Sequence, residues 1–275
     1  MSSPVTQNIY DNSRFFDAYA ALPRSQEGLS AAKEWSTIKD MVLGNHQTLR
    51  KYSVLDLGCG YGWFARWARE SGATFIKAVD ISENMIQRAK AFELSHGTAG
   101  LGSISYHIAD IETIILDNEP AVYDIVYSSL TFHYIYDFAR VLQQIRSCIR
   151  KGGRLVFSIE HPVATAPVDP GPAFQRMPRD DRDGAQGMFW PLNSYEEEGP
   201  RYTNWLGVEG VKKYHRTLET YLRILRENGF ALIDLREWTI SREDAVKQPE
   251  YAAERQKPYF LLVSSEAVPF ALCMR

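Results

Sequence analysis

Between residues 51 and 161, short apolar runs alternate with longer amphipathic stretches, and this alternation restricts the fold more than any other feature of the chain. Five runs have the length and apolar content of strands: SVLDLGC, TFIKAVDI, ISYHIADI, YDIVYSSL and RLVFSIEH. Helices are predicted between them at WFARWARES, ENMIQRAKAFELS and FARVLQQIRSCIRKGG, the last ending at Gly152-Gly153. Strands that alternate with helices form a parallel, doubly wound α/β sheet covered on both faces. Such sheets bind ligands at the carboxyl ends of their strands.

The rest of the 275 residues surrounds this core, and we expect one enlarged domain over 1–275. Residues 1–50 carry helical amphipathic patterns, which predict a cap. Residues 51–161 form the predicted cofactor-binding core. Residues 162–215 are rich in proline and glycine and show little periodicity, which favours an inserted substrate lid. Residues 216–275 contain a predicted helix, TLETYLRILRENG, and two further strands, FALIDLREWTI and PYFLLVSSEA.

Composition excludes several classes of protein. A hydrophobic content of 45% and a net charge of −3 are those of a chain with a sizeable core, not of a disordered one. The near-neutral balance and the lack of a basic stripe argue against a nucleic-acid partner. No run is apolar enough to span a membrane and the first residues do not resemble a signal peptide, so we expect a cytoplasmic protein. Cys59, Cys148 and Cys273 are too few and too scattered for a zinc site or a disulfide framework, and we expect no metal.

The sharpest local signal is the loop Asp56-Leu57-Gly58-Cys59-Gly60-Tyr61-Gly62 after the first predicted strand. Glycines allow positive φ and let backbone N–H groups approach a ligand closely, although an ordinary strand-to-helix turn also uses them. Asp80 stands 22 residues after Gly58, at the end of the next strand, where a carboxylate can accept hydrogen bonds from both hydroxyls of an adenosine ribose. Asp110 follows the third strand and can accept from an adenine amino group.

Two details separate this loop from a nicotinamide site. The third glycine follows the second by two residues instead of three, and Asp56 precedes the first glycine by two. A pyrophosphate group favours a helix N-terminus free of negative charge, whereas a ligand with an ammonium and a sulfonium group tolerates the carboxylate. The residue types therefore favour S-adenosylmethionine over NAD.

Five segments together resemble the successive motifs of class I S-adenosylmethionine-dependent methyltransferases, in the small-molecule branch that includes ubiquinone and menaquinone biosynthesis enzymes. They are VLDLGCGYGWFARWARESGA, AVDISENMIQRAK, IADIE, YDIVYSSLTFHYIYD and IRKGGRLVFSIEHP. The resemblance implies a Rossmann-like seven-stranded sheet with an antiparallel last strand, an N-terminal helical cap and an insertion after the fifth strand. It also implies S-adenosylmethionine as methyl donor and S-adenosylhomocysteine as product. Residues 1–50 and 162–215 lie where such enzymes vary, so the resemblance does not name the substrate.

The resemblance also implies roles for individual residues. The methionine moiety of the cofactor would face Asp56, Gly58, Cys59 and Gly60. Asp80 would hold the ribose. The adenine would lie between Ile81 and Met85, with Asp110 and Ile111 at its edge. Ser128 and Leu130 would lie beneath the sulfonium. Tyr19 and Arg24 are candidates for closing over the cofactor carboxylate, where an arginine would form a charge-assisted pair; a core tyrosine and a surface arginine are the alternative.

Methyl transfer requires alignment, exclusion of water and, for some acceptors, removal of a proton. Three histidines are candidate bases, because all can titrate near neutral pH: His133 after the fourth strand, His161 at the end of the fifth, and His215 at the end of the insertion. Any of them can instead be a histidine that hydrogen-bonds the backbone or packs on an aromatic ring. Position ranks His133 first, His161 second and His215 third.

The insertion is rich in aromatic residues, which suit either a lid over a hydrophobic or aromatic substrate or the burial of the insertion and a subunit contact. They are Phe189, Trp190, Tyr195, Tyr202, Trp205 and Tyr214. We therefore expect an enzyme that methylates an oxygen, nitrogen or carbon of a small molecule, as a monomer or homodimer. Two alternatives keep the cofactor: a rearrangement or cyclisation promoted by the sulfonium charge, and a non-catalytic cofactor-binding subunit.

Overall fold

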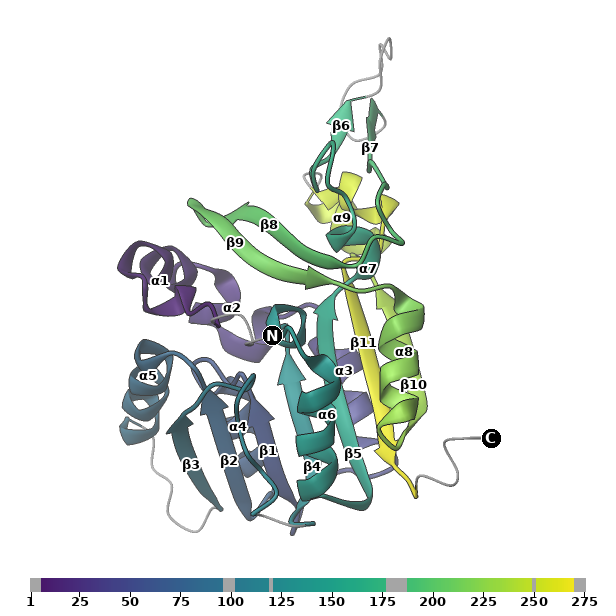
Figure 1. The fold of residues 1–275 in the computed structure, drawn as a ribbon. Helices are drawn as coiled ribbons and strands as arrows, with labels where there is room; N and C mark the ends of the chain where they lie inside the picture. Colours follow the sequence, from purple (N-terminus) through teal and green to yellow (C-terminus); the bar gives the residue numbers. More distant parts are fainter. Residues whose placement is uncertain (1–5, 96–101, 119–120, 177–186, 249–250, 270–275) are drawn as a thin grey trace.

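A computed structural model describes residues 6–95, 102–118, 121–176, 187–248 and 251–269. Its centre is a seven-stranded sheet with the strand order β10-β11-β5-β4-β1-β2-β3 (Figure 1). The strands are β1 (Ser53–Leu57), β2 (Phe75–Asp80), β3 (Ser103–Ile108), β4 (Tyr123–Ser129), β5 (Ile149–Glu160), β10 (Phe230–Trp238) and β11 (Phe260–Ala267). β11 is antiparallel to both β5 and β10, while β1 to β5 pair in parallel. The predicted Rossmann-like sheet with its antiparallel last strand is confirmed.

Helices cover both faces of the sheet, as the alternating pattern predicts. The helices of the core are α4 (Trp63–Glu70), α5 (Glu83–Leu94), α6 (Phe138–Cys148) and α8 (Leu218–Glu227). One buried cluster joins α6 and α8 to the sheet, and a second joins α3 (Trp35–Leu43), α4 and α5 to its other face. Val54 and Leu55 are fully buried in β1, which runs between these two clusters. Burial on both faces explains why the strands read as continuous apolar runs.

The N-terminal segment forms short helices above the carboxyl ends of the strands (Figure 1). They are η1 (Ile9–Asp11), α1 (Ser13–Ala20), α2 (Pro23–Gln26) and η2 (Gly28–Ala31). Asn12 caps α1 by accepting a hydrogen bond from the Phe15 amide, and Pro23 occupies the first turn of α2. The Pro23-Arg24 pair therefore starts a short helix of its own.

The segment after β5 contains more regular structure than its sequence suggests. It holds α7 (Pro162–Thr165), β6 (Gln175–Arg176), β7 (Met188–Phe189) and a hairpin of β8 (Gly199–Trp205) and β9 (Val208–His215). In Figure 1 this hairpin extends from the sheet toward α1. Two further short helices, α9 (Arg242–Lys247) and η6 (Ala253–Gln256), lie between β10 and β11.

The predicted end of the third core helix at Gly152-Gly153 is wrong. α6 ends at Cys148, and β5 begins at the next residue, where Ile149 pairs with Tyr123. The register between β4 and β5 shifts after this pair, so the two glycines lie within an irregular stretch of the strand and not at a helix terminus. In the described part of the chain no helix is long and apolar enough to cross a membrane. Cys273 lies outside the described residues.

Candidate active site

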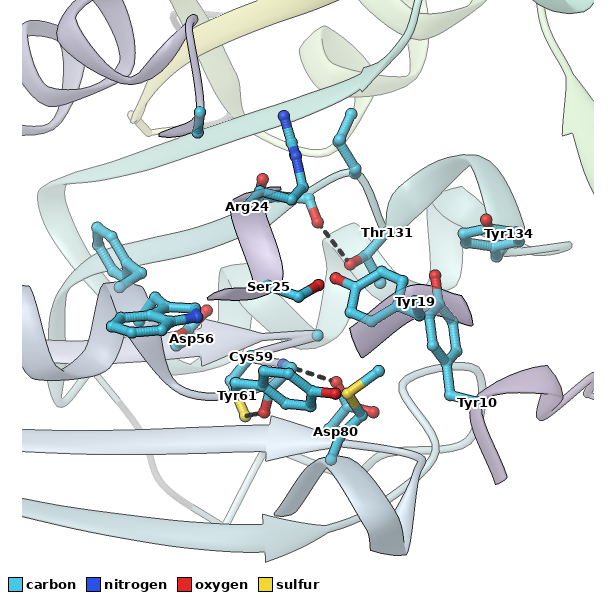
Figure 2. A pocket seen from close by; sticks show the side chains of 18 of the residues that line it. Tyr10, Tyr19, Arg24, Ser25, Asp56, Cys59, Tyr61, Asp80, Thr131 and Tyr134 are labelled. Carbon is cyan, nitrogen blue, oxygen red and sulfur yellow. Dashed lines mark hydrogen bonds between the residues drawn. The ribbon is translucent and has the colours of Figure 1, made fainter. Parts of the chain in front are cut away.

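A cavity of about 390 Å³ opens at the carboxyl ends of β1, β2 and β4, under the N-terminal helices. Most of the site residues predicted from sequence line it. They are Tyr19, Arg24, Asp56, Gly58, Cys59, Gly60, Asp80, Ile81, Met85, Asp110, Ile111, Leu130 and His133. Ser128, His161 and His215 do not. Figure 2 shows part of this cavity, with Asp56 at the left, Asp80 below the centre, and Tyr10 and Tyr134 at the right.

The glycine loop has the backbone that its sequence predicts. The amides of Gly58 and Cys59 both donate to the Val79 carbonyl, at 2.8 and 2.9 Å, which ties the loop to the end of β2. Gly60 has a φ of 51°, and a Cβ added there would meet no atom within 4 Å. Because Gly60 also lines the cavity, this open space belongs to the ligand side of the loop.

Asp80 is held at the end of β2 by two backbone amides. Its Oδ2 accepts from the Gly60 amide at 2.8 Å, and its Oδ1 accepts from the Ser82 amide at 2.9 Å. Burial raises the pKa of Asp80 to about 6, although these hydrogen bonds oppose the shift. Each carboxylate oxygen has a second lone pair, so the group can accept one hydroxyl at each oxygen while keeping both amides.

Asp56 is buried at the end of β1, and its Oδ2 has no hydrogen-bond partner among the described residues. Burial, reinforced by the charge of Asp80, raises the pKa of Asp56 well above its ordinary value. Three donors that line the same cavity are also buried without a partner: the hydroxyls of Ser25 and Tyr61 and the indole N–H of Trp63. Buried polar groups are normally hydrogen-bonded, so one acceptor and three donors fit a ligand with both an ammonium and a carboxylate group.

The side chains predicted to surround the adenine line the same cavity. Ile111 and Met85 are buried, and both line the cavity together with Ile81. Asp110 lies at the same edge, where its Oδ1 accepts from the Glu112 amide at 2.8 Å. An apolar slot with a carboxylate at its rim can hold a planar base that carries an amino group.

Tyr19 and Arg24 both line the cavity from the N-terminal helices. The Tyr19 ring packs edge-on against Tyr61, at 6.0 Å between centroids. Arg24 donates from one guanidinium nitrogen to both carboxylate oxygens of Glu34, at 2.8 and 3.2 Å. A guanidinium has five N–H groups, so this pair leaves donors for a ligand.

The two residues predicted beneath the sulfonium differ in position. Leu130 lines the cavity with a φ of 50°, a left-handed conformation that is uncommon for leucine, and its amide donates to the Ser158 carbonyl at 2.8 Å. Ser128 is fully buried, and its hydroxyl donates to the Leu57 carbonyl at 2.8 Å. Ser128 therefore links β4 to β1 behind the cavity wall.

The cavity is also lined by aromatic rings, one histidine and one carboxylate, which together are called its aromatic compartment. Aromatic rings from four separate segments line it: Tyr10, Tyr134, Trp205, Tyr259 and Phe260. His133 is buried there, and its Nδ1 accepts from the Glu160 amide at 3.3 Å. The Glu160 carboxylate pairs with the Lys213 ammonium of β9 at 2.5 Å. Burial lowers the pKa of His133 to about 4, so its imidazole is neutral at physiological pH.

His161 and His215 have both ring nitrogens occupied away from the cavity. His161 caps α7 by accepting from the Val163 amide, and its Nε2 contacts Glu237 at 2.9 Å. His215 contacts the Thr165 hydroxyl at 2.8 Å and the Tyr195 carbonyl at 2.8 Å. The geometry thus gives both histidines structural contacts and does not bring them together with His133.

Several residues that the sequence reasoning did not select line the cavity, among them Tyr10, Ser25, Trp63 and Glu160. Glu160 could have been selected from the sequence, because it lies at the end of the predicted fifth strand, where ligands bind in such sheets. Among the aromatic residues of the insertion, Trp205 alone lines the cavity within the described chain. Trp190 instead donates to the Val163 carbonyl, and Tyr202 is 67% exposed.

Comparisons with known proteins agree with this geometry. A family model described as a methyltransferase domain matches residues 55–157. A crystal structure of an S-adenosylmethionine-dependent methyltransferase from Mesorhizobium loti is 37% identical, covers 87% of this chain and 100% of that one, and superposes with a TM-score of 0.73. An uncharacterized protein of Haemophilus influenzae is 30% identical over 84% of this chain and 85% of its own length. A malonyl-[acyl-carrier protein] O-methyltransferase of Buchnera aphidicola is 31% identical over 43% of this chain and 44% of its own.

The chain belongs to the S-adenosylmethionine-dependent methyltransferases. Its cofactor is S-adenosylmethionine, and the unpartnered atoms around the glycine loop fit that molecule, since its methionine moiety carries one ammonium and one carboxylate group. When bound, the cofactor supplies an activated methyl group on a sulfonium.

Proposed function

We propose that this methyltransferase transfers the methyl group to an oxygen, nitrogen or carbon of a small hydrophobic or aromatic molecule. The observation that carries the proposal is that one cavity is lined both by the glycine loop and by the aromatic compartment, which includes His133 and Trp205. A subunit that only bound the cofactor would not need the aromatic compartment. Its rings offer apolar faces with few polar groups, which is the composition of sites for small organic ligands.

In this proposal the chain holds the cofactor along the carboxyl ends of β1 and β2. Asp80 accepts the ribose hydroxyls and Asp56 the methionine ammonium, while Ser25, Trp63 and Arg24 donate to the methionine carboxylate. Trp63 is well placed to serve as a rigid donor, because its indole packs on Gly28 and lies 4.6 Å from the Arg66 guanidinium. These contacts fix the methyl group at the start of the aromatic compartment, and their rigidity reduces the cost of alignment.

Within residues 162–215, the hairpin of β8 and β9 acts as the lid in the same proposal. The hairpin β8–β9 brings Trp205 onto the N-terminal cap, where its ring packs against Phe15 at 5.2 Å and Tyr19 at 6.4 Å between centroids. The Lys213–Glu160 pair ties the hairpin to the end of β5. A closed lid excludes water from the sulfonium, which prevents the loss of methyl groups to solvent.

The test is a product search. The protein is incubated with S-adenosylmethionine carrying a CD₃ group and a low-molecular-weight extract of the source cells, and products are resolved by mass spectrometry. Methyl transfer predicts S-adenosylhomocysteine together with a product that contains the CD₃ group, both reduced with Asp80→Asn when the cofactor is below saturation. A product with the mass of its precursor would instead establish a rearrangement. Tight cofactor binding with no change in any metabolite would establish a non-catalytic subunit.

A further inference from the structure

The environment of His133 narrows the class of acceptor, and the inference rests on the function proposed above. The His133 Nδ1 accepts a hydrogen bond from the Glu160 amide at 3.3 Å. A ring nitrogen that accepts from an amide carries no proton, so Nε2 is the N–H of the neutral imidazole. His133 lines the cavity, and Nε2 has no hydrogen-bond partner among the described residues. The ring therefore offers the acceptor a proton donor and not a lone pair.

Three charged groups act on His133. The short helix η3 (Phe132–Tyr134), which carries the histidine, packs against β5 and β9. Among the charged side chains of these elements and of the residue after β9, Glu160, Lys213 and Arg216 influence the imidazole, and of these three Glu160 lines the cavity. The Glu160 carboxylate is paired with Lys213 at 2.5 Å. Arg216 is buried and donates to the Ile135 and Tyr136 carbonyls at 2.7 and 2.6 Å. The Glu198 carboxylate, which accepts from the Thr217 amide, also acts on this guanidinium. Glu160 is held by Lys213, and the His133 ring presents an N–H instead of a basic nitrogen to the cavity, so this arrangement suits an acceptor that needs no deprotonation.

We propose that His133 donates its Nε2–H to an acceptor oxygen that is already ionised, so that the substrate is a carboxylic acid or an acidic phenol or enol. The oxygen bonds to the methyl carbon as the carbon–sulfur bond breaks, and the electron pair of that bond stays on sulfur. The anionic oxygen has no proton to lose. No general base is required, and the product carries one negative charge fewer than the acceptor.

One further observation agrees with this role. Burial, together with Lys213 and Arg216, lowers the pKa of His133, and only Glu160 opposes the shift. A histidine that stays neutral down to about pH 4 keeps its Nε2–H donor through the physiological range but is a very weak base. The low pKa thus suits a donor to an anion and does not suit proton abstraction.

The tautomer can be tested without a substrate. In protein labelled with ¹⁵N-histidine and saturated with S-adenosylhomocysteine, the His133 signals are identified by their loss in His133→Gln. We expect an unprotonated Nδ1 and a protonated Nε2 that do not titrate between pH 5.5 and 9. A protonated Nδ1, or a midpoint between pH 6 and 8, would overturn the inference.

The acceptor class is tested with S-adenosyl-[methyl-³H]methionine and a small-molecule extract separated on an anion exchanger at pH 7. We expect labelled product from the retained fraction, eluting as a species with one negative charge fewer. Release of labelled methanol by alkali identifies a carboxylate, and an alkali-stable label identifies a phenol or enol; both outcomes support the inference. Labelling of amines alone would refute this inference but not the proposed function, and labelling of no fraction would refute both.

Variants distinguish donation from base catalysis once the product is known. Glutamine retains an N–H donor near the position of Nε2 and has no basic nitrogen. His133→Gln should therefore keep kcat/KM within roughly tenfold of the parent, while His133→Leu loses roughly 10- to 150-fold, the value of one hydrogen bond to a charged group. Equal losses in both variants would contradict the donor role. The exposed His46, substituted by glutamine, serves as the control and should leave kcat/KM unchanged.

Discussion

Substituting Asp80 by asparagine should weaken cofactor binding without breaking the fold. The carboxylate accepts the Gly60 and Ser82 amides on separate oxygens and has one lone pair left on each for a ribose hydroxyl. Asparagine has one oxygen and one NH₂ group, so one amide and one hydroxyl lose their acceptor. The loss of one charge-assisted hydrogen bond costs about 1.5–3 kcal/mol, which is roughly a 10- to 150-fold increase in the Kd of S-adenosylhomocysteine.

The pKa of Asp80 adds a second, independent signature. Burial raises it to about 6, and ribose hydroxyls bind the ionised form. Affinity should therefore be constant above pH 7 and fall by about tenfold between pH 7 and 5 through this group alone. The stability of the ligand-free protein changes with pH in the opposite direction. Folding raises the pKa of Asp80 from 3.8 to about 6, so the protonated carboxyl contributes fully to the free energy of unfolding below pH 3.8. This contribution, about 3 kcal/mol for two pKa units, is lost as the pH rises through 6.

Calorimetric titration of both proteins with S-adenosylhomocysteine from pH 5 to 8 measures these effects. The difference between parent and variant isolates Asp80, because other titrating groups contribute to both curves. Asp124→Asn is the matched control: its carboxylate accepts from the Ser53 amide at 2.8 Å, at the other end of the sheet and outside the cavity. An Asp80→Asn variant with unchanged Kd, or one whose affinity keeps the same pH dependence, would refute the assignment of the ribose site.

Three further predictions concern other parts of the site. Asp56→Asn should weaken S-adenosylhomocysteine binding at least tenfold by calorimetry, while an analogue without the amino group binds parent and variant equally; a loss shared by both ligands would exclude Asp56 as the ammonium partner. Trp205→Ala should raise the KM for the acceptor and leave the cofactor Kd unchanged, whereas Tyr202→Ala, on the exposed side of the same hairpin, should change neither in steady-state kinetics. His161→Ala should lower the free energy of unfolding by about 1–2 kcal/mol in denaturant titrations, because α7 loses its cap, with kcat unaffected; a large loss of kcat would return His161 to the chemistry.

The sequence predicted the parts of the fold that repeat a simple physical pattern. β1, β2, β4 and β5 are largely buried between the two helical layers, so they read as apolar runs, and the glycines between β1 and α4 mark the loop that lines the cavity. The hairpin β8–β9 was missed because its exposed and half-buried residues alternate without an apolar run, as in GPRYTNW. Gly152-Gly153 misled the prediction since a glycine pair fits a strand irregularity as well as a helix end.

The residues of the candidate site could likewise be predicted only in part from the sequence. Asp56 and Asp80 lie at the carboxyl ends of β1 and β2, and Asp110 follows β3, so their position at one sheet edge could be inferred from the predicted strands. The aromatic compartment combines Tyr10 and Trp205, which are far apart in the chain and meet only because the cap and the hairpin fold over the same edge. The sequence ranked His133 above His161 and His215 by position alone, and the hydrogen bonds of the latter two show why they do not face the cavity.

The central claim is that one cavity binds the cofactor at the ends of β1 and β2 and the acceptor beyond it. A crystal structure with S-adenosylhomocysteine tests this most directly. We predict the ribose hydroxyls on the two oxygens of Asp80, the ammonium on Asp56, and the sulfur facing the compartment of His133 and Trp205. Density for the ligand elsewhere, or in this cavity with its sulfur directed away from His133, would contradict the account.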